Sequence, residues 1–470
     1  MRKKYALIML LIVSFSGFAQ KNDRQPKERP ESTFKTDIPA HNYNLILSRP
    51  TDQSITISIF SYKNAEAYLV YFQKKSDKQN KTNILMLNAN KPVETILGNL
   101  ITNSQYSYYV IYKAEGEKDF TKSVTYSFHT QRTAADSFCF TLTADSHLDE
   151  NADKQVYTNT LLNAASDSAD FHVDLGDTFM TDKYRQDYKN AFNQYIAQRY
   201  YFSLLHSPLF LVLGNHDGES GQRLNGIDNN MTVWSNQNRK DFFPNPEPNG
   251  FYSGNSQSEK YVGLPQDYYS WTWGNALFIV LDPFLFTSRS GMDNPWDRTL
   301  GKTQYDWLKS TLENSKTIFK FVFIHNLVGG VDNKGKGRGG AEVAGLYEWG
   351  GKNPDGTDGF KTHRPDWKMP IHELLKKYHV NVVFHGHDHL FAKQEKDGII
   401  YQCISQPGSM RTRASNQATE YGYLNKDIFL NPGYMRVSLQ KNRALFEFVN
   451  TNNTDTSKNK KVIYNYELKK

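Results

Sequence analysis

The residues best suited to chemistry in this chain are histidines, aspartates and one asparagine that directly follow short apolar segments. The last such segment, residues 382–390 (VVFHGHDHL), carries His387 and His389 one residue apart. Because side chains at positions i and i+2 point the same way where a strand ends, we expect these two imidazoles to face one spot. Gly386 would allow the chain to turn tightly beside them. One pair alone does not define a metal site, but further clusters lie upstream: Asp145-Ser146-His147, Gly176-Asp177, Gly214-Asn215-His216-Asp217 and His325.

The elements that must position these clusters are short buried strands that alternate with helices. We expect strands at residues 138–143, 171–175, 209–213, 277–281, 319–324 and 380–384, and helices at 156–166, 188–205, 304–313 and 370–378. This alternation predicts an α/β layered domain. Sites in α/β sheets form outside the carboxyl ends of the strands, so clusters that are far apart in the sequence can meet there.

The side chains that could bind metal are Asp145, His147, Asp177, Asn215, His325, His387 and His389. Seven ligands are too many for one open catalytic ion and suit two ions that share a carboxylate. Carboxylates, an amide and imidazoles favour Mn, Zn or Fe(II), and the absence of a thiolate disfavours a closed structural zinc site. Two ions about 3.5–4 Å apart can clamp a phosphoryl group and lower the pKa of a bridging water.

Taken in order, the motifs DSH, GDTF, GNHD, an apolar strand ending in His, and GHDH resemble the signature of calcineurin-like metallophosphoesterases. The resemblance extends over roughly residues 137–439 and implies a four-layer αββα fold with a dinuclear site at the sheet edge. It implies that the first ion is held by Asp145, His147 and His389, that Asp177 bridges, and that the second ion is held by Asn215, His325 and His387. A hydroxide bridging the two divalent ions would then attack phosphorus.

The resemblance also assigns roles around the substrate. His216 would act as general acid or as a donor to a phosphate oxygen, so Asn215 and His216 would both contact the substrate. Asp217 is a possible orienting partner, which the pattern does not decide. Purple acid phosphatases have a tyrosine three residues after the bridging aspartate, whereas this chain has Met180. We therefore expect no tyrosinate colour and no obligate Fe(III) ion.

The domain organisation follows from changes in pattern along the chain. Residues 1–19 have a basic start, an apolar stretch and small residues before Gln20, which is typical of a secretory signal peptide. Residues 20–37 are polar, which indicates a flexible linker. Residues 38–132 contain short alternating segments typical of an antiparallel β-sandwich, at 54–60, 67–72, 82–87, 93–97, 106–112 and 124–129. Residues 135–470 form the expected metallophosphoesterase domain.

The N-terminal segment resembles the fibronectin type III-like module of purple acid phosphatases. Leu97-Gly98-Asn99-Leu100 followed by Tyr106 resembles the corner in which a tyrosine hydroxyl caps a turn. No acid–histidine cluster occurs in this region, so we expect a spacer or packing module rather than a binding module.

The composition and the leader restrict the partners. The net charge of +7 includes three basic residues of the leader, so the mature chain is near +4 and no nucleic-acid partner is expected. We expect an exported protein, periplasmic or secreted, with no membrane span after signal cleavage and a small-molecule phosphate ester as substrate. The oligomeric state is left open, as is a disulfide between Cys139 and Cys403. A phosphomonoesterase is favoured; a phosphodiesterase or nucleotidase with the same site, or a binding or adhesion protein with a vestigial site, are the alternatives.

Two insertions, residues 218–265 and 329–367, are rich in Asn, Gly and Ser and are expected to lack regular structure. Arg364, at the end of the second insertion, could grip a phosphate or lie solvated in a loop. His172 and His385 lie in the apolar segments that precede the ligand motifs and are expected to be structural or to support the ligands. Tyr268, Tyr269, Trp271 and Trp273 are expected in a half-buried strand.

Overall fold

The computed structural model describes residues 34, 38–76, 78–149, 152–183, 188–288, 294–330, 337–409, 418–423 and 427–470. The predicted signal peptide, residues 1–19, lies outside the described residues, as does the predicted linker, residues 20–37, apart from Phe34. Within the described part, no helix combines the length and apolar character needed to cross a membrane.

The N-terminal region is an antiparallel β-sandwich. One sheet has the order β1 (Tyr43–Ser48), β2 (Ile55–Ser61), β6 (Val93–Leu97). The other has the order β4 (Asn80–Lys81), β3 (Ala65–Gln73), β7 (Gln105–Ala114), β8 (Thr121–Lys122), with β5 (Leu85–Leu87) on β3 and β9 (Tyr126–His129) on β7. A shared apolar core joins the two sheets. The Tyr106 hydroxyl accepts a hydrogen bond from the Ile101 amide at 2.9 Å, which confirms the tyrosine corner.

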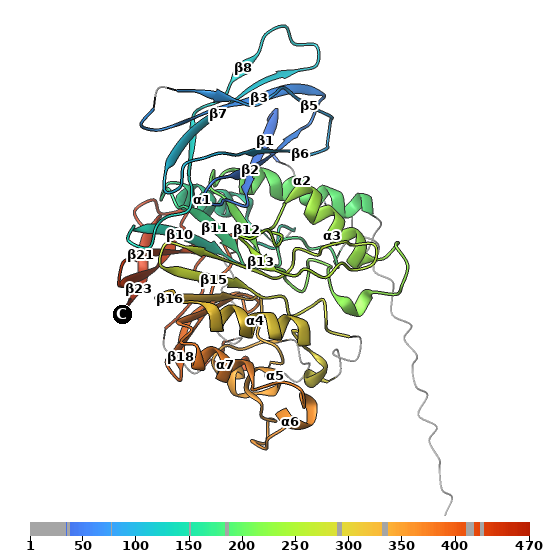
Figure 1. Ribbon diagram of the computed structural model, residues 1–470, viewed down its shortest axis with the longest axis vertical. Coiled ribbons are helices and arrows are strands. Elements are labelled where there is room, and N and C mark those ends of the chain that lie inside the picture. The colour runs from blue at the N-terminus through green and yellow to red at the C-terminus, as the bar shows by residue number, and fades with distance from the viewer. Residues whose placement is uncertain are drawn as a thin grey trace, which may run out of the picture. The chain divides into compact units, whose positions relative to one another are not determined.

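Two further sheets form the centre of the remaining chain (Figure 1). One has the order β12 (Leu209–Leu211), β11 (Phe171–Asp174), β10 (Phe138–Thr143), β21 (Gly433–Gln440), β22 (Arg443–Asn450), β23 (Lys461–Lys469). The other has the order β13 (Ser253–Gly254), β14 (Tyr269–Trp273), β15 (Ala276–Val280), β16 (Phe319–Phe323), β17 (Val382–His385), β19 (Ile399–Cys403), β18 (Phe391–Lys396), β20 (Ile428–Phe429). The strands β10, β11 and β12 are parallel, and so are β15, β16, β17 and β19.

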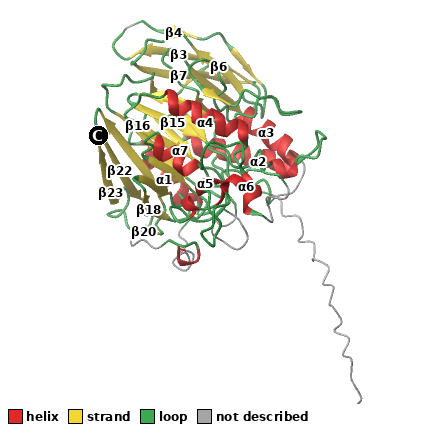
Figure 2. Ribbon diagram, turned by 60° about the horizontal axis from the view of Figure 1, so that its bottom comes forward, coloured by secondary structure: helices red, strands yellow, loops and turns green. Residues whose placement is uncertain are grey.

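Helices cover the outer face of each sheet, which confirms the four-layer αββα arrangement (Figure 2). An apolar core rich in phenylalanine lies between the sheets. On one side α1 (Lys154–Ala165), α2 (Tyr188–Ser203) and α3 (Met231–Phe242) pack in an apolar cluster with β12. On the other side α4 (Lys302–Asn314), α5 (Tyr347–Gly350), α6 (Phe360–His363) and α7 (Ile371–Lys377) pack with β15 and β16. α1 starts where the Asp153 carboxylate accepts hydrogen bonds from the Gln155 and Val156 amides.

Several expectations about the insertions and strand segments are wrong. The first insertion contains α3 and β13, and the second contains α5 and α6, so neither lacks regular structure. The segment expected as one strand at 82–87 holds only β5, while β4 precedes it. The aromatic strand is buried rather than half-buried, because Trp271 and Trp273 belong to the core between the sheets.

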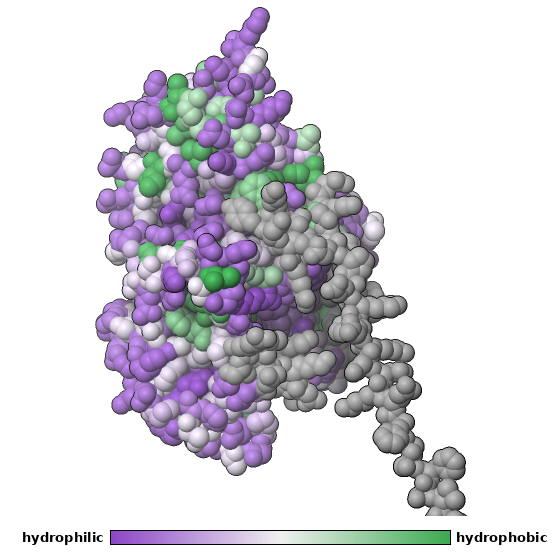
Figure 3. All heavy atoms as spheres, turned by 90° about the vertical axis from the view of Figure 1, so that its right-hand side faces the viewer, coloured by the Kyte–Doolittle hydropathy of each residue, from purple (hydrophilic) through white to green (hydrophobic). Residues whose placement is uncertain are grey.

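Among the described residues, the surface of the sandwich carries half of the large apolar side chains that are exposed, including Ile84, Met86, Ile96 and Val124. On the face drawn in Figure 3, apolar side chains form small groups among hydrophilic ones. The sandwich is also joined to the layered region through Arg199 of α2, a fully buried side chain. Its guanidinium donates hydrogen bonds to Asn44, Ser58 and the Phe242 carbonyl.

Candidate metal centre

The predicted ligands all follow carboxyl ends of strands that the two sheets bring to one edge. Asp145 and His147 follow β10, Asp177 follows β11, and Asn215 follows β12. From the other sheet, His325 follows β16, and His387 and His389 follow β17. Because the strands within each set run parallel, their carboxyl ends lie at the same edge.

The side chains assemble into two groups that share one aspartate. The first group is Asp145, His147, Asp177 and His389; the second is Asp177, His325 and His387; within each group the ligand-type atoms lie within 4.8 Å of one another. Oδ2 of Asp177 is 3.2 Å from Nε2 of His147 and 3.4 Å from Nε2 of His325. Asn215 joins the second group, since its Oδ1 is 3.2 Å from Nε2 of His325. All seven predicted ligands are therefore brought together.

His387 and His389 do not face one spot, so that expectation is wrong. His387 belongs to the group with His325, while Nε2 of His389 lies 3.4 Å from Oδ1 of Asp145. The reason is that both residues lie in a turn beyond β17 and have left-handed backbone, with φ of 70° and 60°. The alternation of side chains along a strand therefore no longer applies to them.

Gly386 is required for space rather than for a special backbone angle. A Cβ at this position would lie 2.4 Å from Oδ2 of Asp145. A Cβ on Gly214 would lie 2.4 Å from Oδ1 of Asp177. Each glycine thus lets one carboxylate approach the backbone of a neighbouring loop.

Each aspartate is fixed through one oxygen and presents the other. Oδ2 of Asp145 accepts a hydrogen bond from the His387 amide at 2.8 Å, and Oδ1 of Asp177 accepts one from the His216 amide at 2.8 Å. Nδ1 of His325 lies 2.8 Å from the Leu175 carbonyl, which directs Nε2 toward the group. Metal-binding histidines are commonly oriented in this way.

The electrostatics of the cluster favour a bound cation. Burial opposes ionisation of Asp177, but the neighbouring His325 and His216 outweigh burial and hold its pKa well below the usual value. Burial lowers the pKa of His325, but the Asp177 carboxylate outweighs it and raises that pKa to about 10. Without a metal, protons on the imidazoles therefore supply the positive charge that the buried carboxylates require.

Several buried atoms of the cluster also lack a hydrogen bond. Oδ1 of Asp145, Nε2 of His147 and Nε2 of His387 have no hydrogen-bond partner within the described residues. Burial, followed by the nearby Arg338, lowers the pKa of His387 well below its usual value, so this imidazole is neutral, the form that binds metal. Buried polar atoms without partners are costly, and these donor types fit divalent Mn, Zn or Fe.

His216 lies at the margin of the cluster with a partner that the sequence analysis missed. Its Nε2 is 4.0 Å from Oδ2 of Asp177, and its Nδ1 is 2.7 Å from Oδ1 of Asp182. Asp217, the orienting partner considered from the sequence, is buried and accepts hydrogen bonds from the Phe179 and Gly214 amides instead. Asp182 follows Asp177 by five positions, and an acid so close to the GDTF motif was the available signal.

Other residues considered from the sequence have structural roles. Arg364 is not solvated in a loop: it pairs with Glu348 (2.6 Å) and donates a hydrogen bond to the Trp296 carbonyl. His172 lies between the hydroxyls of Thr141 and Thr143, and Met180 is buried in the apolar cluster of α2. Cys139 and Cys403 are both free thiols.

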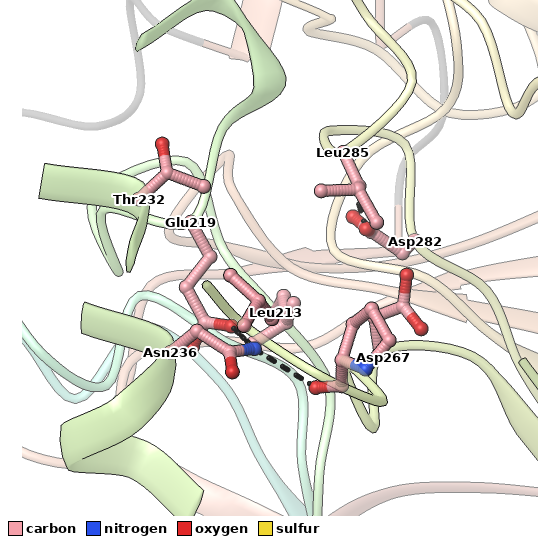
Figure 4. Close-up of a pocket in the computed structure, with 9 residues that line it drawn as sticks. Leu213, Glu219, Thr232, Asn236, Asp267, Asp282 and Leu285 are labelled. Carbon is pink, nitrogen blue, oxygen red and sulfur yellow. Dashed lines mark hydrogen bonds between the residues drawn. The ribbon is translucent and has the colours of Figure 1, made fainter. Parts of the chain in front are cut away.

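A small cavity lies beside the strand ends (Figure 4). Figure 4 shows Asp267 and Asp282 on one side and Glu219 with Asn236 on the other, where the Asn236 amide donates to Glu219 at 2.7 Å. Burial raises the pKa of Asp267 to about 6 and that of Asp282 well above its usual value. Among the described residues, these carboxylates are not part of a group that could hold a metal ion. The cavity therefore marks where the first insertion, held by the buried Glu219–Arg239 pair, packs on the sheet.

Comparisons with known proteins agree with this geometry. Residues 140–391 match the family described as calcineurin-like phosphoesterase, which is more than half of the chain. No curated protein matches the chain. Among solved structures, PhoD is similar with a TM-score of 0.61 and 14% identity, covering 88% of each chain. The purple acid phosphatase PPD1 from yellow lupin (Lupinus luteus) seeds is similar with a TM-score of 0.59 and 14% identity, covering 91% of this chain and 74% of that one. These two likenesses concern the fold, whereas the family match shows that the chain belongs to the calcineurin-like phosphoesterases and is a metal-dependent phosphoesterase.

Proposed function

We propose that this protein is an exported phosphomonoesterase that works with two divalent metal ions. The observation that carries the proposal is the pair of ligand groups that share Asp177. Asp145, His147 and His389 would hold one ion, Asn215, His325 and His387 would hold the other, and Asp177 would contribute to both. When bound, the pair of ions, Mn, Zn or Fe, supplies Lewis acidity and activates water at neutral pH.

The protein's own residues prepare the site for the phosphate group. The backbone amides of His387 and His216 fix the two aspartates, so their free oxygens face the imidazoles before any ligand binds. This fixed arrangement limits reorganisation when charge develops in the reaction. Asn215 and His216 lie side by side at the edge of the cluster and contact the substrate phosphate.

His216 donates a proton to the departing alcohol. Its Nδ1–H group donates to Asp182, which leaves Nε2 directed toward the cluster, 4.0 Å from Asp177. A protonated Nε2 can therefore give its hydrogen to the leaving oxygen or to a phosphate oxygen. Asp182 stabilises the charged imidazole and fixes the orientation of its ring.

The substrate class and the location rest on further support. The lupin acid phosphatase shares the fold over most of this chain, including the region of the sandwich, which favours a phosphomonoester. The basic and apolar leader at residues 1–19 favours export to the periplasm or the medium. We propose domain limits of 38–132 for the sandwich and 135–470 for the phosphoesterase domain.

The test is metal content measured together with activity on a phosphomonoester, a phosphodiester and a nucleotide. We expect two equivalents of metal, loss of activity with a chelator, recovery with Mn or Zn, and the highest kcat/KM for the monoester. A higher kcat/KM for the diester or nucleotide would replace the phosphomonoesterase assignment. Purified protein that holds much less than two equivalents after metal loading would indicate a vestigial site.

A further inference from the structure

Asp388 lies between the two histidines of the GHDH motif but takes no place in either ligand group. Its side chain is buried, and its carboxylate accepts three hydrogen bonds. Oδ1 accepts one from Nη1 of Arg338 at 3.2 Å. Oδ2 accepts one from the Gly339 amide at 2.8 Å and one from the Tyr423 hydroxyl at 2.7 Å. The carboxylate therefore ties the metal-binding turn to two other segments of the chain.

Arg338 contacts the same turn directly. Its Nη1 also donates to the carbonyl of His387 at 2.8 Å, and its guanidinium lies 4.6 Å from the centre of the Tyr421 ring. The side chain is only 20% exposed. Arg338 thus holds both the backbone of a ligand residue and the carboxylate of the next residue.

The second insertion packs closely at this point. A Cβ on Gly340 would lie 2.2 Å from Oε1 of Gln394 and 3.2 Å from Nε2 of His385. The Ala341 amide donates to the same Gln394 oxygen at 3.0 Å. Gly340 and Ala341 of the second insertion are therefore fixed against β17 and β18 rather than projecting from the surface.

The turn needs such support because of its backbone. His387 and His389 both have positive φ, a backbone conformation that is unfavourable for a residue with a side chain. Strained backbone persists only where the surroundings fix it. Asp388 lies between these two residues and is held by three hydrogen bonds. It therefore fixes the backbone of the turn from which each imidazole is directed to its own ion.

We propose that Asp388 and Arg338 are positioning residues that hold the His387–His389 turn, so that the second insertion supports both halves of the metal centre. The inference rests on the proposed dinuclear site but concerns residues that touch neither ion. Loss of the contacts made by Asp388 and Arg338 frees both imidazoles at once, so the affinity for metal falls before substrate binding is affected. Removal of groups that orient metal ligands commonly costs 10- to 100-fold in metal affinity.

The experiment measures metal affinity by competition with a chelator, together with kcat and KM, for R338M, R338K, D388N and Y423F. We expect R338M and D388N to bind metal 10- to 100-fold more weakly and to lose kcat with little change in KM. R338K should recover part of the affinity, and Y423F, which removes one hydrogen bond, should lose less. Should R338M fail to fold, R338K and Y423F carry the comparison.

The matched control is R364M, which removes another largely buried arginine of the same insertion from its ion pair with Glu348. This variant should lose stability while the folded molecules keep wild-type metal affinity. Folded R338M and D388N with wild-type metal affinity would overturn the inference. A raised KM with unchanged metal affinity would also overturn it, because Arg338 would then be a substrate contact. Wild-type protein that binds no metal would refute the proposed function itself. This result is distinguishable from failure of the inference, in which the wild type and the variants bind metal equally well.

Discussion

Replacement of Asp182 by asparagine tests the assignment of His216. The side chains of His216 and Asp182 are 27% and 21% exposed, and their hydrogen bond is 2.7 Å long. D182N keeps the volume and removes the charge that holds the imidazole. A hydrogen bond to a charged group contributes about 1.5–3 kcal/mol. Since 1.4 kcal/mol corresponds to a factor of ten, we expect kcat to fall about 10- to 100-fold where the leaving alcohol needs a proton.

The assay compares two phosphomonoesters that differ in their leaving group. An alkyl phosphate releases a basic alkoxide that requires protonation, whereas nitrophenyl phosphate releases a stable phenolate. If His216 acts as general acid with the help of Asp182, D182N should reduce kcat strongly for the alkyl ester and only slightly for the nitrophenyl ester. Metal content and KM should be close to those of the wild type, because Asp182 belongs to neither ligand group.

A matched control is D397N, which changes a second aspartate–histidine pair. Oδ2 of Asp397 lies 2.9 Å from Nε2 of His372, and this pair includes none of the predicted ligands. D397N should leave kcat unchanged for both esters. Equal losses for the two esters in D182N would show that Asp182 acts on the fold or the metals, and unchanged kcat for the alkyl ester would refute the role assigned to the pair.

Three further predictions concern stability and metal binding. Burial raises the pKa of Asp174 to about 7, so in chelator-treated protein the folded state keeps a proton that the unfolded chain releases near pH 4. The free energy of unfolding should therefore decrease by up to about 4 kcal/mol as the pH rises from about 4 to 7. Thermal melts of D174N across that pH range should not show this decrease. Parallel pH profiles for D174N and the wild type would contradict the assignment to Asp174. In G386A the new Cβ would clash with the Asp145 carboxylate, so bound metal and activity should be lost, whereas G98A, which has open space around its Cβ, should keep both. R199A leaves several buried acceptors without a donor, so denaturant unfolding should show a loss of about 3 kcal/mol, and unchanged stability would mean that the contact with the sandwich is weak.

The sequence predicts the positions of the ligands because two signals coincide there. Apolar runs rich in β-branched and aromatic residues mark the buried strands, and β10 has the bounds expected for it. Parallel strands present their carboxyl ends at one edge, so acids and histidines placed after each run must lie close together. Asp145, Asp177 and His325 meet for this reason, although 180 positions separate the first from the last.

Other features depend on tertiary contacts that leave no local pattern. Asp182 follows no apolar strand, and only the folded chain shows that it faces His216. The left-handed backbone of His387 and His389 is not visible in a sequence, so alternation along a strand did not predict that they belong to different ligand groups. In the first insertion, Arg239 of α3 pairs with Glu219, twenty positions away, and this buried pair stabilises a segment whose composition resembles a loop.

The sandwich contributes to the site through two adjacent residues of α2. Arg199 donates hydrogen bonds to Ser58 in β2 of the sandwich. Gln198 donates to the Ser146 hydroxyl at 2.9 Å and to the Thr178 carbonyl at 2.7 Å, in the loops that carry the ligands of the first group. Because neighbouring residues of a helix move together, the contact that fixes Arg199 also fixes Gln198 against these loops. The N-terminal module is therefore a packing partner of the catalytic layers rather than a spacer, which explains why a buried arginine is placed beside a glutamine that supports the metal loops.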